Sequence, residues 1–365
     1  MKVLFMANIP SPYRVDFFNE LGKNCDLTVT FEGKTATDRD VKWKAAEYRN
    51  FKAVFMNGIR TKSDQFLCVD ILKIIKSGFD HIILGGYSTP TAMLAIEYMR
   101  LKHIQFWMEA DGGMIAKDSY FKYQIKRHFI SAASGWFSSG KMTTEYLVHY
   151  GADKARVHLY PFTSLKAADI LPSVPKLENK EELKKNLHLS EGLIAIAVGQ
   201  FIRRKGFDVL LKSWAKCNKK YELYIIGAEP TAEYIELKKN LMLDNVHFEG
   251  FKTKEELKQY YQAADLFVLP TREDIWGLVV NEAMANGLPV LTTDKCVAGL
   301  ELIEDGINGY IVPVEDERML AERITAMLEN NYLRNTMTEK SLEKIRDYTV
   351  ENMVRAHLDV LKIEE

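Results

Sequence analysis

The chain has 365 residues, which exceeds the usual size of a single hydrophobic core and predicts two domains of ordinary length. Hydrophobic residues make up 47% and charged residues 27%, and the net charge is −1, a composition typical of a globular protein that folds in water. The longest apolar runs, such as residues 193–198, are far too short to cross a bilayer, so we expect no membrane-spanning segment.

The cysteines and the first residues bear on the cellular compartment. Cys25, Cys68, Cys217 and Cys296 show no paired spacing, which argues against a zinc knuckle and against a disulfide framework. The apolar run after Met1 is too brief for a secretory signal. We therefore expect a cytoplasmic protein.

The small net charge conceals an uneven distribution along the chain. Residues 1–170 hold 23 basic and 17 acidic side chains, whereas residues 171–365 hold 26 and 33. A basic first half suggests an anionic partner, such as a phospholipid surface or a lipid diphosphate. Drift in surface composition explains so modest a bias equally well.

Apolar runs alternate with helical patterns from the first residues onward, which predicts an α/β fold with parallel sheets. In the first half we expect strands at residues 2–6, 26–31, 53–56, 81–84, 105–108 and 135–138, and helices at 13–21, 69–77, 89–102 and 142–150. The second half repeats the plan, with strands expected at residues 193–198, 221–226, 246–249, 266–269, 289–292 and 310–312.

Two further segments set the domain organisation. Residues 167–175 include Pro172 and Pro175, show no clear period and predict a linker, and residues 350–365 predict a final amphipathic helix. We therefore expect a first Rossmann-like domain over residues 1–170 and a second over residues 171–349.

Three segments of the first half offer polar groups at strand ends. The loop at residues 7–14 contains two prolines that would present Tyr13 and Arg14, although a rigid structural turn explains it equally well. After the strand at 105–108, Glu109 or Asp111 could accept a hydroxyl hydrogen bond, and a turn made by Asp-Gly-Gly is the simpler alternative. The pair Asp38 and Asp40 follows no strand, so we expect an ordinary polar loop there.

Residues 117–129 mix lysines with aromatic side chains. A helix of this composition can lie in a membrane interface with its aromatic residues inward. The alternative is that Phe121, Ile125 and Phe129 point to the protein core.

A basic loop follows the strand at residues 193–198. Arg203, Arg204 and Lys205 stand beside Gly206 at the carboxyl end of that strand, which makes a concentrated site for phosphate oxygens. A solvated basic loop is the simpler explanation for such a run taken alone.

Residues 270–289 combine acidic groups with a helix that begins after a glycine. The strand at 266–269 ends at Pro270, and the helix should begin near Gly277, so that its free N–H groups face the sheet edge where α/β folds bind ligands. Asp274 in the loop and Glu282 in the helix can then reach one site, where carboxylates suit vicinal diols. Charge-capping of a solvated helix is the alternative.

At these motifs the chain resembles the family 4 retaining glycosyltransferases, which have the GT-B fold, belong to glycosyl transferases group 1 and serve polysaccharide or glycolipid assembly. Their pattern of two acids around Gly-Leu-x-x-x-Glu-Ala-Met-Ala-x-Gly-x-Pro-Val matches residues 274–290. The family usually has glutamate where this chain has Asp274, with Glu273 one residue earlier. It usually has arginine at Gln200, so Arg203 or Arg204 would replace that arginine.

The resemblance implies two Rossmann-like domains whose parallel sheets face each other across a cleft, with the terminal helix crossing back onto the first. It implies that Lys205 and an arginine hold a leaving diphosphate, that Glu282 holds a ribose, and that Asp274 orients the sugar. The expected donor-binding residues are Gly199, Gln200, Gly250, Phe251, Glu273, Gly277, Leu278, Val279 and Glu282. The expected acceptor-binding residues are Pro12, Tyr13, Arg14, Glu109 and Asp111.

The sequence thus predicts a retaining, metal-independent glycosyltransferase without a cofactor. Its donor would be a nucleoside diphosphate sugar, with UDP favoured over GDP, and its acceptor a glycan or lipid-linked glycan for cell-surface polysaccharide. It would be cytoplasmic, and contact with the anionic inner face of the cell membrane is left open. The alternatives are a non-catalytic nucleotide-sugar-binding subunit and a GT-B sugar-nucleotide epimerase.

Overall fold

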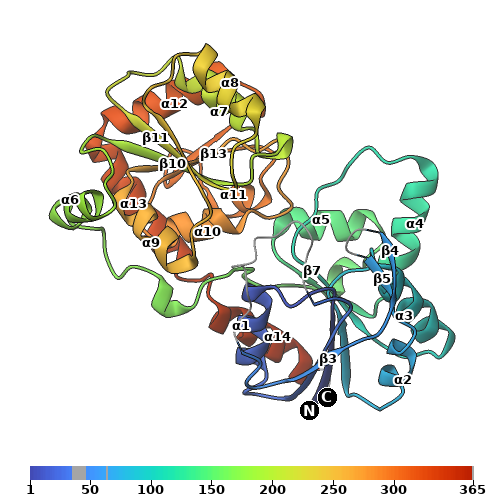
Figure 1. Ribbon diagram of the computed structural model, residues 1–365. Helices are drawn as coiled ribbons and strands as arrows, with labels where there is room; N and C mark the ends of the chain where they lie inside the picture. Colours follow the sequence, from blue (N-terminus) through green and yellow to red (C-terminus); the bar gives the residue numbers. More distant parts are fainter. Residues whose placement is uncertain (35–46, 63–64, 364–365) are drawn as a thin grey trace. The chain divides into compact units, whose positions relative to one another are not determined.

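The computed structural model describes residues 1–34, 47–62 and 65–363 (Figure 1). Contacts between residues divide the chain into two compact units. Met1–Ser164, together with the chain from Thr349 onward, forms the amino-terminal unit, and Leu165–Tyr348 forms the carboxy-terminal unit. The predicted polar loop at Asp38 and Asp40 lies outside the described residues.

The amino-terminal unit is built on a parallel sheet, as the sequence predicts. Its strands lie in the order β3-β2-β1-β6-β7-β8-β9, so β1 has the next strand of the chain on one side and a later strand on the other. This reversal marks β1 as the topological switch point, where open α/β sheets bind ligands. The strands are β1 (Lys2–Ala7), β2 (Asp26–Phe31), β3 (Lys52–Phe55), β6 (His81–Leu84), β7 (Trp107–Ala110), β8 (Gly135–Ser138) and β9 (Val157–Leu159).

The helices of this unit begin where the sequence offers caps. Ser11 precedes α1, which has Pro12 in its first turn, and the Thr89 side chain accepts a hydrogen bond from Ala92 N at the start of α3. The helices are α1 (Pro12–Leu21), α2 (Ile71–Ile75), α3 (Pro90–Leu101), α4 (Tyr120–Ile130), α5 (Lys141–His149) and α14 (Val350–Ile363). The sequence did not predict the antiparallel hairpin of β4 (Ile59–Lys62) and β5 (Gln65–Leu67).

The predicted terminal helix is confirmed as α14, which packs against α1 (Figure 1). Its buried face includes Met353, His357 and Leu361, which recur at four-residue spacing. The last helix of the chain therefore completes the core of the unit that contains the first strand.

The carboxy-terminal unit has a second parallel sheet, with helices on both of its faces (Figure 1). Its order is β12-β11-β10-β13-β14-β15, and each of the six strands expected from the sequence is present, with ends shifted by no more than one residue. The strands are β10 (Ile194–Gly199), β11 (Glu222–Gly227), β12 (Val246–Glu249), β13 (Leu266–Leu269), β14 (Val290–Thr293) and β15 (Gly309–Val312). The helices are α6 (Leu177–Asn186), α7 (Phe207–Trp214), α8 (Ala232–Asn240), α9 (Lys254–Ala263), α10 (Leu278–Ala285), α11 (Val297–Leu302), α12 (Glu317–Glu329) and α13 (Asn331–Ile345).

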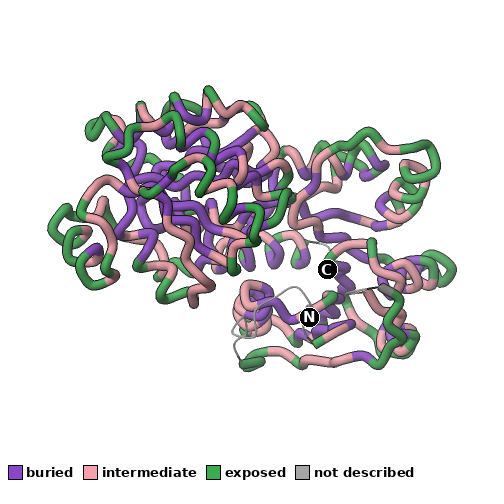
Figure 2. Tube along the Cα trace, turned by 45° about the horizontal axis from the view of Figure 1, so that its top comes forward, coloured by how far each residue is buried: buried purple, intermediate pink, exposed green. Residues whose placement is uncertain are grey.

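Burial follows the strands in both units (Figure 2). β13 is buried over its whole length because helices cover both faces of its sheet. Residues 167–175, the predicted linker, include a 3-10 turn at Ala167–Asp169, and Leu171 N donates to Ala285 O within the carboxy-terminal unit.

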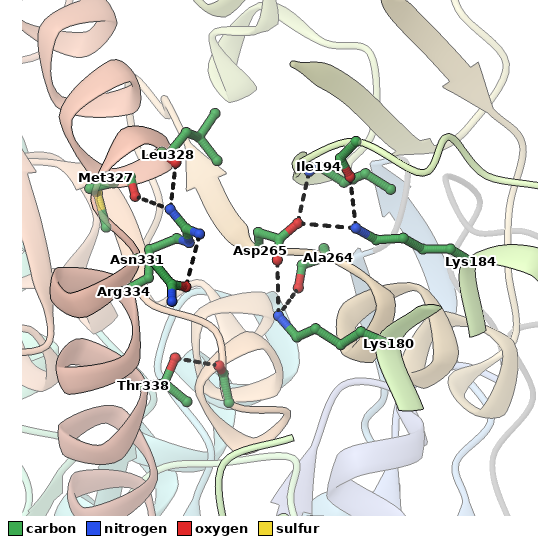
Figure 3. Close-up of polar contacts among 12 residues, drawn as sticks. Lys180, Lys184, Ile194, Ala264, Asp265, Met327, Leu328, Asn331, Arg334 and Thr338 are labelled. Carbon is green, nitrogen blue, oxygen red and sulfur yellow. Dashed lines mark hydrogen bonds and ion pairs between the residues drawn. The ribbon is translucent and has the colours of Figure 1, made fainter. Parts of the chain in front are cut away.

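A buried carboxylate ties α6 to the start of the second sheet (Figure 3). Asp265 accepts hydrogen bonds from Ile194 N at 2.9 Å, Lys180 Nζ at 3.2 Å and Lys184 Nζ at 3.4 Å. Burial raises the pKa of Asp265, but the two lysines and the Ile194 N–H outweigh it, so the pKa lies below its ordinary value. Asp265 therefore stabilises the fold as a charged group.

Replacing Asp265 tests this anchor. Asp265→Ala leaves two mostly buried lysines without their partner, so we expect a loss of about 3–5 kcal/mol in the free energy of unfolding. Urea denaturation followed through the fluorescence of the buried Trp214 measures it. Asp244→Ala, at an exposed position, should change the stability by less than about 0.5 kcal/mol.

The same anchor gives a pH dependence. Because the folded-state pKa of Asp265 is lowered, its contribution is complete above the ordinary aspartate pKa of 3.8 and is lost as the pH falls through the folded-state pKa. Equal stability of the Asp265→Ala and Asp244→Ala variants would contradict the assignment.

Candidate functional site

The basic loop of the carboxy-terminal unit runs from the end of β10 to the start of α7. Gly199 ends the strand, a 3-10 turn spans Arg203–Lys205, and Gly206 has a φ of +70°. A Cβ at Gly206 would lie 2.0 Å from Pro270 O, so only glycine fits this close approach to the end of β13. The backbone therefore holds Lys205 beside the loop that follows β13.

Lys205 contacts the carboxylate of Asp274, which we expect from the sequence to bind a sugar. Lys205 Nζ lies 2.6 Å from Asp274 Oδ2, and Arg204 Nη1 lies 3.3 Å from Asp274 Oδ1. The side chains of Lys205 and Asp274 are only 11% and 12% exposed. The expected phosphate-binding cations and the expected sugar-binding acid thus form one compact cluster.

The neighbouring Glu273 occupies a different position. Its backbone oxygen accepts a hydrogen bond from Arg204 Nη1 at 3.0 Å, and the residue is exposed. Asp274 N donates to Lys295 O, and Val297 N donates to Asp274 O, which fixes the direction of the Asp274 side chain. Of the two adjacent acids, the fold places Asp274 in the cluster.

Helix α10 begins beside this cluster, and the sequence prediction of its start near Gly277 is confirmed. Gly277 is the N-cap with a φ of +104°, and a Cβ there would lie 3.7 Å from Asp274 Cγ. Leu278 and Val279 form the first turn, whose N–H groups lack intrahelical acceptors. The positive end of the helix dipole therefore lies next to Asp274.

Glu282 lies in the second turn of the same helix. It is half-buried and accepts a hydrogen bond from Tyr261 Oη, with Oη and Oε2 3.4 Å apart. Burial raises the pKa of Tyr261, and the charge of Glu282 raises it further, so Tyr261 stays a donor. Tyr261, which the sequence did not single out, thus orients Glu282.

The other expected donor-binding residues lie at neighbouring strand ends. Gln200 is half-buried after β10, and Gly250 and Phe251 follow β12 as half-buried residues. A Cβ at Gly199 would lie 3.3 Å from Lys205 Cδ, so this glycine lies against the lysine stem. The structure therefore brings Gly199, Lys205, Asp274 and the start of α10 together.

Arg272, which lies outside the basic loop, stabilises it. Arg272 binds Asp208 through two hydrogen bonds of 2.7 Å, contacts Glu315, and donates to Arg203 O at 2.7 Å. Asp208 and Glu315 raise the pKa of Arg272 above its usual range. The sequence did not predict these ion pairs of Arg272 because Asp208 and Glu315 are dozens of residues away from it.

In the amino-terminal unit, the expected acceptor residues meet in a buried polar network. The Arg14 guanidinium binds both Glu109 and Asp111, and its side chain is 7% exposed. Tyr160 Oη donates to Glu109 Oε1 and Asp111 Oδ1, each at 3.2 Å. The expectation that the loop presents Arg14 is wrong, because its guanidinium turns inward and is occupied by two carboxylates. Pro12 and Tyr13 are half-buried in the first turn of α1.

His357 of α14 completes this network. Its Nε2 lies 3.0 Å from Glu109 Oε2, its Nδ1 lies 2.8 Å from Met353 O, and its ring stacks on Phe137 with centroids 4.3 Å apart. The sequence predicted only an amphipathic helix here and no partner for the histidine.

The pKa values of the two carboxyl groups of the network are shifted in opposite directions. Burial raises the pKa of Glu109, but Arg14 and His357 outweigh it and lower the pKa to about 2. Burial raises the pKa of Asp111 to about 6, with Arg14 opposing and negative Glu109 adding to the rise. Asp111 is the more accessible of the two, with a side chain 31% exposed against 0% for Glu109.

The described part of the chain offers neither a metal-binding cluster nor a membrane-spanning helix. Residues 1–34, 47–62 and 65–363 contain no group of three or more histidine, cysteine or acidic side chains that could hold a metal ion. Within the same ranges, every helix lacks the length or the apolar composition that spanning a bilayer requires.

The two parallel sheets, with polar groups at their strand ends, define the GT-B class of fold. The structure aligns with HepE from Anabaena, solved in complex with UDP and glucose, over 100% of both chains with a TM-score of 0.78 and 16% identity. It aligns with the lipopolysaccharide glycosyltransferase WaaG with a TM-score of 0.68 and 15% identity, over 98% of this chain and 99% of WaaG.

The match to a known family lies in the carboxy-terminal unit. Residues 178–344 match the family model described as Glycosyl transferases group 1. This part of the chain contains Lys205, Asp274 and Glu282.

Two relatives extend the comparison at the level of sequence. An uncharacterized glycosyltransferase of Haemophilus influenzae is 30% identical over 183 residues, or 49% of this chain and 51% of the relative. Lipopolysaccharide glucosyltransferase WaaG of Escherichia coli is 24% identical over 250 residues, or 62% of this chain and 63% of WaaG. The chain thus spans about half to two thirds of the length of these curated relatives.

Gly206 provides a test of how the basic loop is held. In Gly206→Ala, a Cβ would meet Pro270 O at 2.0 Å in a left-handed backbone, so we expect a loss of more than about 2 kcal/mol in stability. Gly78→Ala is the matched control, because Gly78 has a φ of +76° with no atom within 4 Å of the new Cβ. It should cost about 1 kcal/mol from backbone strain alone. Urea denaturation compares them, and equal losses would contradict the close approach.

Proposed function

We propose that the protein is a retaining glycosyltransferase that moves a sugar from a nucleoside diphosphate sugar to an acceptor hydroxyl. The observation that carries this proposal is the cluster of Lys205, Arg204 and Asp274 at the amino-terminal end of α10. Cations and helix N–H groups at one sheet edge favour a diphosphate, and adjacent carboxylates favour sugar hydroxyls. The family match over residues 178–344 supports the same activity.

The ion pairs of Asp274 suggest how a donor would enter. A diphosphate has the charge to replace the Asp274 carboxylate on the Lys205 ammonium and the Arg204 guanidinium. The released carboxylate then accepts hydrogen bonds from the transferred sugar. Glu282, held by Tyr261, accepts the hydroxyls of the ribose.

We propose the following chemical step. The bond between the anomeric carbon and the diphosphate oxygen breaks, and its electron pair stays with the diphosphate. The acceptor oxygen forms its bond on the same face, and its proton passes to the departing diphosphate, so the anomeric configuration is retained. Lys205 and Arg204 stabilise the charge that develops on the leaving group, so the step needs neither a metal ion nor a cofactor.

We propose UDP as the nucleotide and a glycan or lipid-linked glycan as the acceptor. HepE, which has a similar fold, was solved with UDP and glucose. A relative with 21% identity over 328 residues, covering 87% of this chain and 84% of its own length, is the N,N'-diacetylbacillosaminyl-diphospho-undecaprenol alpha-1,3-N-acetylgalactosaminyltransferase of Campylobacter jejuni. Asp111 has the more accessible carboxyl of its network and would accept a hydrogen bond from a hydroxyl of the acceptor glycan.

Donor binding and the two site residues give the main test. In a thermal-shift screen, we expect UDP-sugars to raise the Tm of the protein more than GDP-sugars do. We also expect the protein to release UDP slowly from a UDP-sugar when no acceptor is present. Lys205→Ala should lower the rate of release at least about 100-fold because it removes charge from the leaving group. Glu282→Ala should weaken donor binding.

The control is Lys216→Ala, which removes an exposed lysine paired with Glu317 and should leave release unchanged. Circular dichroism verifies the fold of each variant. Full activity of both site variants would contradict the site assignment. Tm shifts without any UDP release would favour the non-catalytic nucleotide-sugar-binding subunit.

We also propose that α4 contacts the anionic inner face of the cell membrane. Tyr120, Phe121 and Ile125 are 73%, 79% and 52% exposed, which rejects the alternative that Phe121 and Ile125 lie in the protein core. The third residue of that alternative, Phe129, is half-buried and does pack against the core. Lys117 and Lys122 are exposed beside them, so aromatic groups could enter the interface while ammonium groups meet phosphates.

Vesicle sedimentation tests this contact. The protein should bind vesicles of phosphatidylglycerol and phosphatidylcholine but not vesicles of phosphatidylcholine alone, and Phe121→Ser with Ile125→Ser should reduce binding at least about fivefold. Tyr332→Ser is the control, because Tyr332 is 82% exposed in the carboxy-terminal unit. Equal losses in the double variant and in the control would overturn the role of α4.

A further inference from the structure

A small pocket opens at the switch point of the amino-terminal sheet, apart from the residues discussed above. It has a volume of about 50 Å³, and its lining residues come from the carboxyl ends of β1, β2 and β6 and the start of α3. Its polar lining is Asn8, Glu32, Gly85, Gly86, Ser88 and Thr89. Of these residues, only Asn8 lies in a loop for which the sequence suggested a functional role, at residues 7–14.

Glu32 is the central group of this pocket. The residue is only 7% exposed, and its Oε1 accepts a hydrogen bond from Thr89 Oγ1 at 2.5 Å. Its Oε2 is buried and has no hydrogen-bond partner among the residues that the structure describes. A buried acceptor without a partner is costly, which points to a group from outside the chain that donates to it.

The pocket also receives the amino-terminal end of α3. This helix runs over 12 residues from Pro90, and Thr89 is its N-cap. Gly86 has a φ of +110°, and no atom lies within 4 Å of the position that a Cβ would take there, so the pocket is open on that side. Pro90 has no N–H and Ala92 N already donates to Thr89, so the end of α3 contributes the positive end of its dipole. The ligand would therefore meet the carboxyl oxygen of Glu32 on one side and this positive end on another.

These two groups restrict the charge of the ligand. Burial raises the pKa of Glu32 to about 7, so above that pH the carboxylate is charged. An anion is then attracted by the end of α3 but repelled by Glu32, whereas a cation is attracted by Glu32 but repelled by the helix dipole. A hydroxyl group can donate to Glu32 Oε2 and accept from Ser88 or the Asn8 amide. Neutral hydroxyl groups thus match both sides of the pocket.

The size of the pocket limits how much of a ligand it holds. Its volume corresponds to a few water molecules at roughly 10–15 Å³ each, which suits one hydroxymethyl group or two hydroxyls but not a whole sugar ring. The remainder of the ligand would lie outside, at the carboxyl edge of the sheet.

We propose that the pocket around Glu32, Ser88 and Thr89 binds the hydroxyl groups of a neutral acceptor sugar. This inference rests on the proposed function, because a glycosyltransferase needs such an acceptor. By this inference the amino-terminal unit recognises the acceptor through hydrogen bonds to its hydroxyl groups.

Ligand-observed saturation-transfer NMR on the full chain tests the pocket with three probes. Methyl β-D-glucopyranoside is neutral, glucosamine is a cation, and glucuronate is an anion. We expect the neutral glycoside to bind the wild type most tightly. At pH 8, above the pKa of about 7 to which burial raises Glu32, Glu32→Gln places an amide donor where the ligand needs an acceptor, so its Kd for the neutral glycoside should rise about tenfold.

Two further variants keep the test decisive. Ser88→Ala removes a hydroxyl from an exposed position without disturbing the core and should also weaken binding. Glu97 lies on α3 and outside the pocket lining, so Glu97→Gln is a control with the same chemical exchange. This variant should bind the glycoside like the wild type. Wild-type affinity in both pocket variants, tighter binding of either charged probe, or no binding of the neutral glycoside by the wild type would overturn the proposal.

Release of UDP by the wild type separates this inference from the proposed function. UDP release without Glu32-dependent binding of the glycoside overturns the pocket and supports the transferase. Glu32-dependent binding without UDP release or donor-induced stabilisation supports the pocket and overturns the transferase.

Discussion

Parallel strands of one sheet all end at the same edge, and the chemistry of both units depends on this constraint. In the carboxy-terminal unit, β10 and β13 are hydrogen-bonded neighbours, so the loops that follow them meet although Lys205 and Asp274 are 69 positions apart. In the amino-terminal unit, the end of β1 leads to Arg14 and the end of β7 to Glu109, which are 95 positions apart. In each unit, strand pairing therefore brings together residues that are far apart in the sequence, which no local sequence motif can do.

The buried acids of the protein differ in how completely their oxygens are used. Asp265 is held by two lysines and a backbone N–H, and Glu109 by Arg14, Tyr160 and His357. Both are internal partners that stabilise the fold. Asp274 instead occupies cations that a diphosphate could take, and Glu32 keeps one oxygen without a partner among the described residues. Glu32 therefore differs from the structural acids by its unused oxygen, and Asp274 differs by the nature of its partners, which are cations that suit a phosphate.

Local patterns predicted most of the elements because buried parallel strands appear as short apolar runs between breakers. The strand β13 and the start of α10 at Gly277 are examples. The strand β7 begins two residues later than predicted, and β9, with only three residues, is too short to give a pattern. The hairpin β4–β5 was missed because its strands are short and lack an apolar run.

The sequence alone determined the two α/β units, the helix that begins after Gly277, and the basic loop before Gly206, since each depends on residue types within one short segment. Only the tertiary structure decided that Asp274 and not Glu273 meets Lys205, that Arg14 turns inward, and that Glu32 retains a buried oxygen without a partner. The physical reason is that the partners of a charged side chain, and its degree of burial, are supplied by strands and helices that are distant in the chain.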